Sequence, residues 1–149
     1  MTGVPAAWAD VFDGRGLASK VGETVLLIAG AEPRVAALSA GEVLVLGERV
    51  GVLLYAGSRT TAAVRDTGRC LLLGVADGGL LRIRVSLAEA TGVELPPGRA
   101  AFAGDIVEVE LDRVGYAEVT SGIRFELDDP AGVAQRWEHQ IEVLEEVLR

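Results

Sequence analysis

The chain has 149 residues, half of them apolar, with a mean hydropathy of +0.34 and a formal net charge of −8. The negative charge repels a phosphate backbone and so argues against nucleic acid as a partner. No apolar run reaches the roughly 20 residues that a membrane-spanning helix needs, so no membrane partner is expected. The length fits one domain over residues 1–149. Apolar surface in this excess is usually covered by another chain, and we therefore predict a homodimer.

The N-terminal half is expected to begin with a short helix and to continue as strands. Proline can take the first helical position in Pro5–Phe12, where Trp8 and Val11 recur at helical spacing. From Glu23 to Gly57, aliphatic and β-branched runs alternate with glycine-containing turns, which is typical of strands and hairpins.

A second short helix is predicted inside this β-rich region, over about Arg59–Thr67. Ser58 can cap it, and Gly68 can end it in the left-handed conformation. Two strands then follow around Asp77-Gly78-Gly79, which is a strong hairpin signal. The second of these strands alternates, with an apolar face formed by Leu81, Ile83, Val85 and Leu87.

A linker-like stretch, Thr91–Gly104, is expected to precede one more strand. Apolar and acidic side chains alternate over Gly104–Val119, so this strand is predicted to be half buried. Its two faces are expected to carry Val109 and Leu111 on one side and Glu108, Glu110 and Asp112 on the other.

The C-terminal segment predicts an amphipathic helix. Asp128 or Asp129 can cap it, and Pro130 suits its first position. Its apolar stripe is formed by Val133, Trp137, Ile141, Leu144 and Leu148. Closely spaced strands with few helices favour a mainly β fold over alternating βαβ units. We therefore predict an antiparallel β-barrel with a short internal helix and a C-terminal amphipathic helix.

Side chains for acid–base, thiol or metal chemistry are scarce. His139 is the only histidine and is expected to face solvent from the charged helix. Cys70 is the only cysteine, which excludes an internal disulfide, and it is expected to be a small buried apolar residue. No catalytic residue and no metal site are therefore predicted. The N-terminus lacks the pattern of a secretory signal, so a cytoplasmic location is expected.

Ser58, Arg59, Thr60 and Thr61 stand where a predicted strand gives way to a helix. Free backbone N–H groups, the positive end of the helix dipole, hydroxyl donors and a fixed cation combine at such a place, and this combination suits a phosphate. The alternative interpretation is that Ser58 only caps the helix and that Arg59 is solvated.

The segment Pro33–Val75 resembles the split β-barrel flavoproteins of the pyridoxamine 5′-phosphate oxidase-like superfamily, and the resemblance extends to roughly Ala90. In that superfamily an arginine-led strand packs along the FMN ring, and a Ser-Arg-Lys segment at a helix start binds the phosphate. Arg34 matches the leading arginine, and Ser58 and Arg59 match the phosphate-binding pair. The resemblance implies a split barrel whose cofactor-binding residues are Arg34, Val35, Ala36, Ala37, Leu38, Ser39, Ser58, Arg59, Thr60 and Thr61.

The resemblance also implies a function, with two departures from the superfamily pattern. Ser39 and Thr60 stand where the superfamily has lysines, and the C-terminal helix stands where the oxidases have an arginine-bearing substrate motif. The implied function is an FMN-dependent oxidoreductase of unknown substrate, a homodimer with FMN between its subunits. The alternatives are a non-catalytic barrel that stores or senses flavin or has lost its cofactor, and a barrel that binds the deazaflavin F420 instead.

Overall fold

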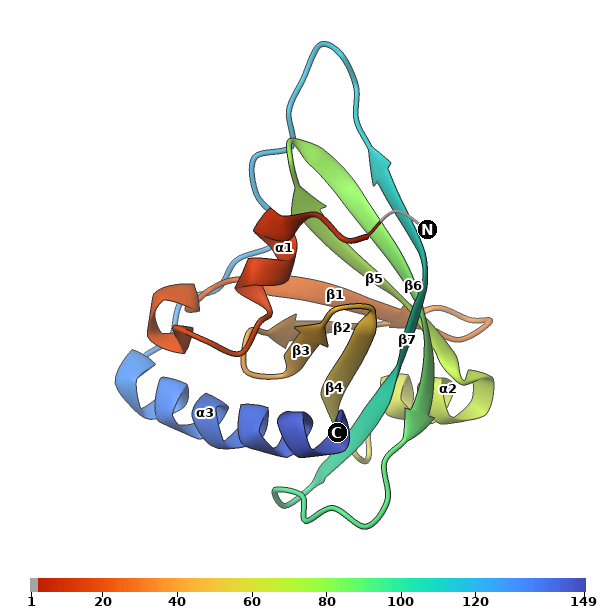
Figure 1. Ribbon diagram of the computed structural model, residues 1–149, viewed down its shortest axis with the longest axis vertical. Coiled ribbons are helices and arrows are strands. Elements are labelled where there is room, and N and C mark those ends of the chain that lie inside the picture. The colour runs from red at the N-terminus through yellow and green to blue at the C-terminus, as the bar shows by residue number, and fades with distance from the viewer. Residues whose placement is uncertain (1–2) are drawn as a thin grey trace.

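The computed structural model describes residues 3–149, and an antiparallel sheet of seven strands dominates it (Figure 1). This confirms the predicted mainly β fold. The helices are α1 (Ala6–Val11), the 3-10 helix η1 (Leu17–Lys20), α2 (Arg59–Thr67) and α3 (Pro130–Val147). The strands are β1 (Thr24–Ala29), β2 (Arg34–Ser39), β3 (Val43–Leu46), β4 (Arg49–Tyr55), β5 (Arg69–Ala76), β6 (Gly79–Glu89) and β7 (Arg99–Asp112).

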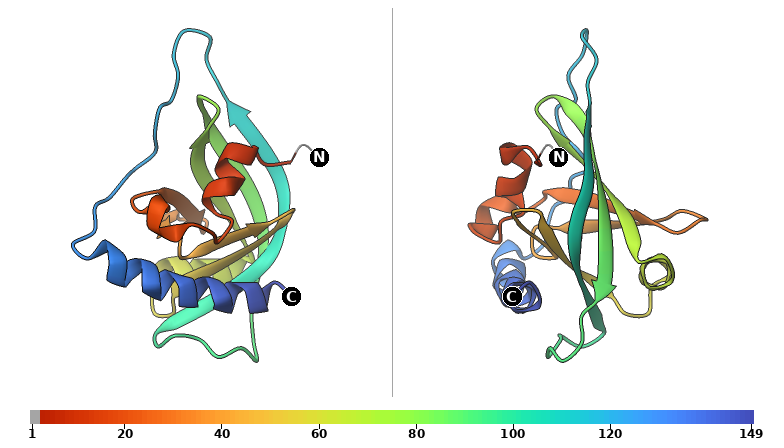
Figure 2. Two further views of the ribbon diagram at one scale, coloured as in Figure 1. Left: turned by 60° about the vertical axis from the view of Figure 1, so that its left-hand side comes forward. Right: turned by 45° about the vertical axis from the view of Figure 1, so that its right-hand side comes forward.

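The strands form one sheet in the order β2-β1-β5-β6-β7-β4-β3, and neighbouring strands are antiparallel throughout. The sheet is strongly curled, but its edge strands β2 and β3 are not neighbours in the sheet order. The result is an open, split barrel. In the right-hand view of Figure 2, α1 and α3 lie on one side of the sheet and α2 lies on the other.

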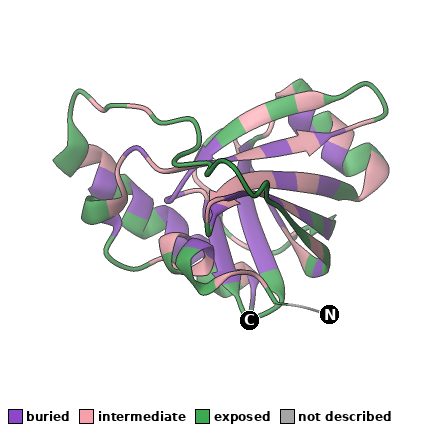
Figure 3. Cartoon of the chain, turned by 90° about the horizontal axis from the view of Figure 1, so that it is seen from above, coloured by how far each residue is buried: buried purple, intermediate pink, exposed green. Residues whose placement is uncertain are grey.

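The barrel interior is built by strands that alternate between buried and exposed side chains (Figure 3). The apolar face predicted for β6 is confirmed, because Leu81, Ile83, Val85 and Leu87 are all buried. Trp8 and Phe12, at the α1 end of the chain, pack into the same core, with ring centroids 4.9 Å apart. Val64 of α2 also joins this core.

The β5–β6 hairpin turns where the sequence predicted. Asp77 and Gly78 both have positive φ angles, 50° and 76°. A two-residue turn with this conformation matches the right-handed twist of the flanking strands, and Asp-Gly is among the sequences that favour it.

The expected bounds of the last strand were wrong at both ends. β7 begins at Arg99, so the second half of the predicted linker is strand. Its small residues are needed there: a side chain at Gly104 would overlap the backbone carbonyl of Ser86 on β6. Beyond Asp112 the predicted strand is absent except for an isolated bridge, Val114–Ala117, because no neighbouring strand continues alongside it.

The C-terminal helix is confirmed, together with its cap and its apolar stripe. The side chain of Asp129 accepts a hydrogen bond from the Gly132 backbone N–H, and Pro130 opens the helix. The stripe packs on the outer side of β3 and β4, over Leu44 and Leu53, and forms a second core. The 3-10 helix η1, which the sequence did not predict, contributes buried Leu17 to this second core.

Of the helices in residues 3–149, none is both long enough and apolar enough to cross a membrane.

Helix α3 packs directly against Gly41, in the turn between β2 and β3. A β-carbon at this position would overlap the Trp137 side chain, and the Gly41 carbonyl accepts a 2.8 Å hydrogen bond from Gln140 Nε2. Only glycine therefore lets the β2–β3 turn and the helix approach this closely.

We predict that Gly41→Ala lowers the free energy of unfolding by at least about 2 kcal/mol, because the added methyl group overpacks the contact with Trp137. Urea denaturation followed by tryptophan fluorescence measures this change. Gly57→Ala is the matched control, since a β-carbon there meets no atom within 4 Å, and it is expected to cost less than about 0.5 kcal/mol. Equal losses in the two variants would show that α3 does not dock through Gly41.

Candidate functional site

The start of α2 is organised by hydroxyl groups. The Ser58 side chain accepts a hydrogen bond from the Thr61 backbone N–H at 3.1 Å and lies 2.9 Å from the Thr61 hydroxyl. That hydroxyl in turn donates to the Tyr55 carbonyl at 2.6 Å. Ser58 is thus the helix cap that the sequence predicted. Both hydroxyls already have partners within the protein, so their first role is to shape the turn between β4 and α2.

The donors left at this helix start come from Arg59 and Thr60. Within residues 3–149 their backbone N–H groups make no hydrogen bond, and the exposed Arg59 side chain forms no ion pair. Thr60 itself is buried. The first N–H groups of a helix and its positive dipole end favour an anion, and a mobile guanidinium adds to this preference. Arg59 is therefore the one formal positive charge among the four residues predicted for the phosphate.

The six residues predicted on the arginine-led strand form β2, an edge strand paired only with β1. Leu38 is buried in the barrel core and Ala36 packs against it, whereas Val35 and Ala37 face outward. Arg34 begins the strand, beside the turn in which Gly30 approaches Ala63 of α2. Ser39 ends it. β2 therefore presents two outward side chains and, within residues 3–149, an unpaired backbone edge.

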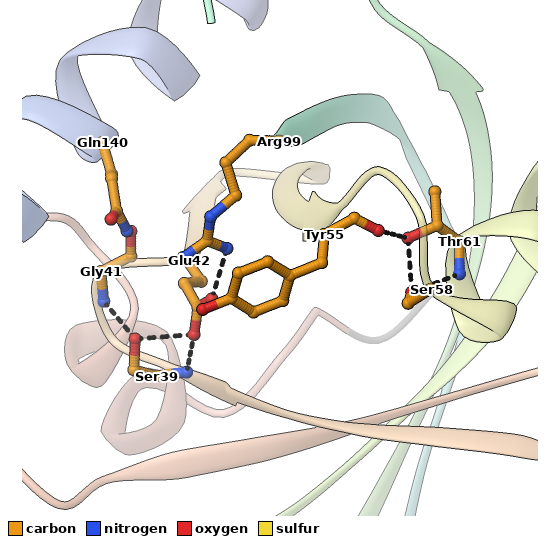
Figure 4. Close-up of polar contacts among 8 residues, drawn as sticks. All are labelled: Ser39, Gly41, Glu42, Tyr55, Ser58, Thr61, Arg99 and Gln140. Carbon is orange, nitrogen blue, oxygen red and sulfur yellow. Dashed lines mark hydrogen bonds and ion pairs between the residues drawn. The ribbon is translucent and has the colours of Figure 1, made fainter. Parts of the chain in front are cut away.

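Ser39 belongs to a polar network at the other end of β2, shown in Figure 4. Its backbone N–H and its hydroxyl both donate to Glu42 Oε1 at 3.0 Å. The other carboxylate oxygen, Oε2, accepts from Arg99 Nη1 at 2.7 Å. The two charged side chains are only 13% and 12% exposed. The carboxylate and guanidinium therefore neutralise each other at the place where the superfamily pattern has a lysine.

Tyr55 joins this network to the start of α2. The Arg99 guanidinium carbon lies 3.9 Å from the centre of the Tyr55 ring, while the Tyr55 carbonyl accepts the Thr61 hydrogen bond. In Figure 4 the tyrosine side chain points toward Glu42 and Arg99, away from Ser58. Glu42, Tyr55 and Arg99 were not predicted from the sequence. The sequence signals for them are a carboxylate three residues after Ser39 and an arginine inside the predicted linker.

An open pocket of about 430 Å³ adjoins the network, between the barrel and α3. This volume falls within the range of small-molecule sites. The polar residues that line it are Ser39, Glu42, Tyr55, Arg99, Arg136 and Gln140, and we call it the α3 pocket.

The outward face of β1, β2 and β5 is apolar and uncovered. Ile28 pairs with Val35 on one side and with Leu71 on the other, so the three side chains form a row across the strands. Val35 is 57% exposed, and Val107, which lines the same hollow as Ile28 and Leu71, is 60% exposed. We call these four residues the outer apolar face.

The lone cysteine and the lone histidine take no part in the polar network around Glu42. Burial raises the pKa of the Cys70 thiol to about 12, so the thiolate that reacts as a nucleophile is scarce at neutral pH. This confirms the prediction that Cys70 is a buried apolar residue. His139 is exposed on α3, as predicted, with its nearest acidic partner, Glu142, at 3.9 Å.

No family profile matches the sequence. No curated protein matches it either. Among solved structures, a candidate pyridoxamine 5′-phosphate oxidase from Lactobacillus delbrueckii is similar, with a TM-score of 0.53 and 15% identity over 72% of this chain and 93% of that one. An F420 reductase is similar with a TM-score of 0.51 and 10% identity, over 72% of this chain and 98% of that one.

A homolog of nitrilotriacetate monooxygenase component B from Mycobacterium thermoresistibile has a TM-score of 0.50 and 12% identity, covering 76% of this chain and 81% of that one. At such low identity the likeness concerns the fold. The resemblance seen in Pro33–Val75 is therefore confirmed as a shared fold: the chain has the split barrel of the pyridoxamine 5′-phosphate oxidase-like proteins.

We predict that Glu42→Gln lowers the free energy of unfolding by about 3 kcal/mol, because it leaves the Arg99 charge nearly buried without a counter-ion. Asp105→Asn is the matched control. It removes the partner of Arg49 from a pair whose side chains are 44% and 76% exposed, and it is expected to cost less than about 1 kcal/mol. Urea denaturation measures both values. Similar losses would show that the buried pair does not stabilise the fold more than a surface pair.

Proposed function

We propose, from the split-barrel fold that the chain shares with flavin proteins, that it binds FMN and works as a cytoplasmic, homodimeric flavin-dependent oxidoreductase. The observation that carries the proposal is the start of α2. There, at a helix N-terminus, the backbone N–H groups of Arg59 and Thr60 and the Arg59 guanidinium have no partner among residues 3–149. This arrangement fits a phosphate group.

The remaining predicted residues would contact the flavin in different ways. Arg34 forms no ion pair within residues 3–149. It would supply a second cation at the start of β2, the end opposite Ser39. Val35 and Ala37 offer outward side chains, whereas the buried side chain of Leu38 leaves only its backbone for contact. Ser39 is held by Glu42, so it meets a ligand as a neutral group. The donors for the phosphate therefore lie on α2, and β2 would run along the ring.

A bound flavin would supply the electron transfer, while the protein provides orientation and electrostatics. This division suits a chain whose only thiol is buried and whose only histidine is exposed on α3. We assign no catalytic side chain, and the substrate is an unidentified small molecule. The similar F420 reductase supports one alternative cofactor, F420. A barrel that stores or senses flavin, or that holds no cofactor, is the non-catalytic alternative.

We predict that the purified protein binds FMN and that Arg59→Gln weakens this binding by roughly 10- to 100-fold, the effect of losing one charge-assisted hydrogen bond. Fluorescence titration with FMN measures the affinity. Riboflavin, which lacks the phosphate, should bind the wild type and Arg59→Gln equally. Arg15→Gln, at an exposed arginine far along the chain from the site, is the control and should change neither affinity.

The outcomes of these titrations separate the alternatives. Equal FMN affinity in wild type and Arg59→Gln would exclude Arg59 as a phosphate ligand. Binding of neither FMN nor riboflavin, with binding of F420, would identify the deazaflavin as the cofactor. Binding of none of the three would indicate an empty barrel. With FMN bound, oxidation of NADH or NADPH at a rate above that of free FMN separates an enzyme from a carrier.

A homodimer remains part of the proposal, and the outer apolar face supports it. Exposed apolar rows of this kind usually mark an interface. The exposed pairs Arg84–Glu108 and Arg82–Asp112 lie on the neighbouring strands β6 and β7. Because each pair carries both signs, the surface can complement a second copy of itself across a twofold axis.

We predict that light scattering gives a particle of twice the chain's 15.6 kDa mass. Val107→Glu and Val35→Glu should shift it to the monomer, because each would bury a charge in the interface. Leu46→Glu places the same charge at another exposed apolar residue, at the end of edge strand β3, and should leave the dimer intact. A wild-type monomer at micromolar concentration would refute the prediction.

A further inference from the structure

Arg99 packs against one face of the Tyr55 ring. Tyr55 is 63% exposed, although Arg99 stacks 3.9 Å from the ring centre. The Arg99 side chain is held in this position because its Nη1 donates to Glu42. The Glu42 carboxylate is itself held by two hydrogen bonds from Ser39. Figure 4 shows this sequence of contacts from Ser39 to the ring. Tyr55 is therefore held in place at the edge of the α3 pocket, while much of its surface is free.

The charges around the α3 pocket favour an anion, although the net charge of the whole chain is −8. Glu42 is the only acidic residue among those that line the pocket, and it is neutralised by Arg99. Arg136 of α3 also lines it, is exposed, and forms no ion pair within residues 3–149. The acidic neighbour Glu126 lines an adjacent hollow instead. The lining residues thus carry a net charge of +1, two arginines against one glutamate.

The rest of the pocket wall is mainly apolar and partly aromatic. Phe125 and Trp137 line it, with their ring centroids 6.5 Å apart in an edge-to-face arrangement, together with Leu127 and Val133. Only one Arg99 side-chain hydrogen bond to another described residue is formed, the bond to Glu42. Its remaining N–H groups are thus without a protein acceptor beside the pocket that the side chain lines.

We propose that the α3 pocket binds a second ligand, a planar aromatic molecule that carries a carboxylate. Its ring stacks on Tyr55, and its carboxylate is held by Arg136 with the open donors of Arg99. Such a ligand is a candidate for the substrate, but its binding does not depend on the flavin proposal. The pocket is built from β2, β4, β7 and α3 side chains, whereas the phosphate donors lie at the start of α2.

The test is a titration of the isotope-labelled, flavin-free protein with 2-naphthoate, followed by NMR chemical shifts at low salt. We expect saturable shifts at Tyr55, Arg99 and Arg136. Naphthalene-2-methanol, which has the same ring without the charge, should bind at least about tenfold more weakly. Tyr55→Leu should weaken 2-naphthoate about tenfold because stacking is lost, whereas Tyr55→Phe should retain it. Arg136→Gln should weaken it about fivefold, and Arg15→Gln should not.

The proposal would be overturned by an absence of 2-naphthoate binding, by equal binding of the charged and neutral compounds, or by equal binding by wild type and Tyr55→Leu. Displacement of 2-naphthoate by riboflavin would also overturn it, because the pocket would then belong to the flavin ring. FMN binding that fails while 2-naphthoate binding succeeds would refute the flavin proposal and leave this one standing. Thermal unfolding of each variant confirms that it is folded.

Discussion

The nearly buried ion pair between Glu42 and Arg99 is the contact on which the arrangement of the site depends. Removing two charges from water is costly, so such a pair stabilises a protein most when its other polar atoms also find partners. Here two donors of Ser39 complete the carboxylate, whereas the guanidinium stacks on the Tyr55 ring and, within residues 3–149, bonds only Glu42. The end of β2, the end of β4 and the start of β7 are thereby fixed relative to one another.

Tyr55 divides this region into two environments with different chemistry. Its carbonyl receives the Thr61 hydroxyl at the start of α2, and its ring lies beside Arg99 at the α3 pocket. On one side a helix N-terminus offers backbone donors and a solvated cation. On the other side, the Glu42 carboxylate paired with Arg99, the aromatic side chains and Arg136 line the α3 pocket. One residue at the end of β4, Tyr55, therefore separates the two proposed ligand sites.

The elements that the sequence predicted correctly were those with a local cause. Ser58 and Asp129 cap their helices through their own side chains, and the Asp77-Gly78 turn follows from two positive φ angles. The start of β7 was missed because Ala100–Gly104 has little strand propensity, and only pairing with β4 and the close approach of β6 make it a strand. The Glu42–Arg99 pair joins residues 57 positions apart, a contact that no local pattern reveals.

The order of the strands also determines how the chain must assemble. The β1–β2, β3–β4 and β5–β6 hairpins join neighbours in sequence. Closing the sheet requires β1 to find β5 and β4 to find β7, for example Leu26 with Leu73 and Tyr55 with Arg99. Each long loop must lose its freedom before these pairings form, which places such topologies among the slower folders, in milliseconds to seconds. The β4–β7 pairing is the one that brings Arg99 to Tyr55, so the site exists only once these two strands, far apart in the sequence, have paired.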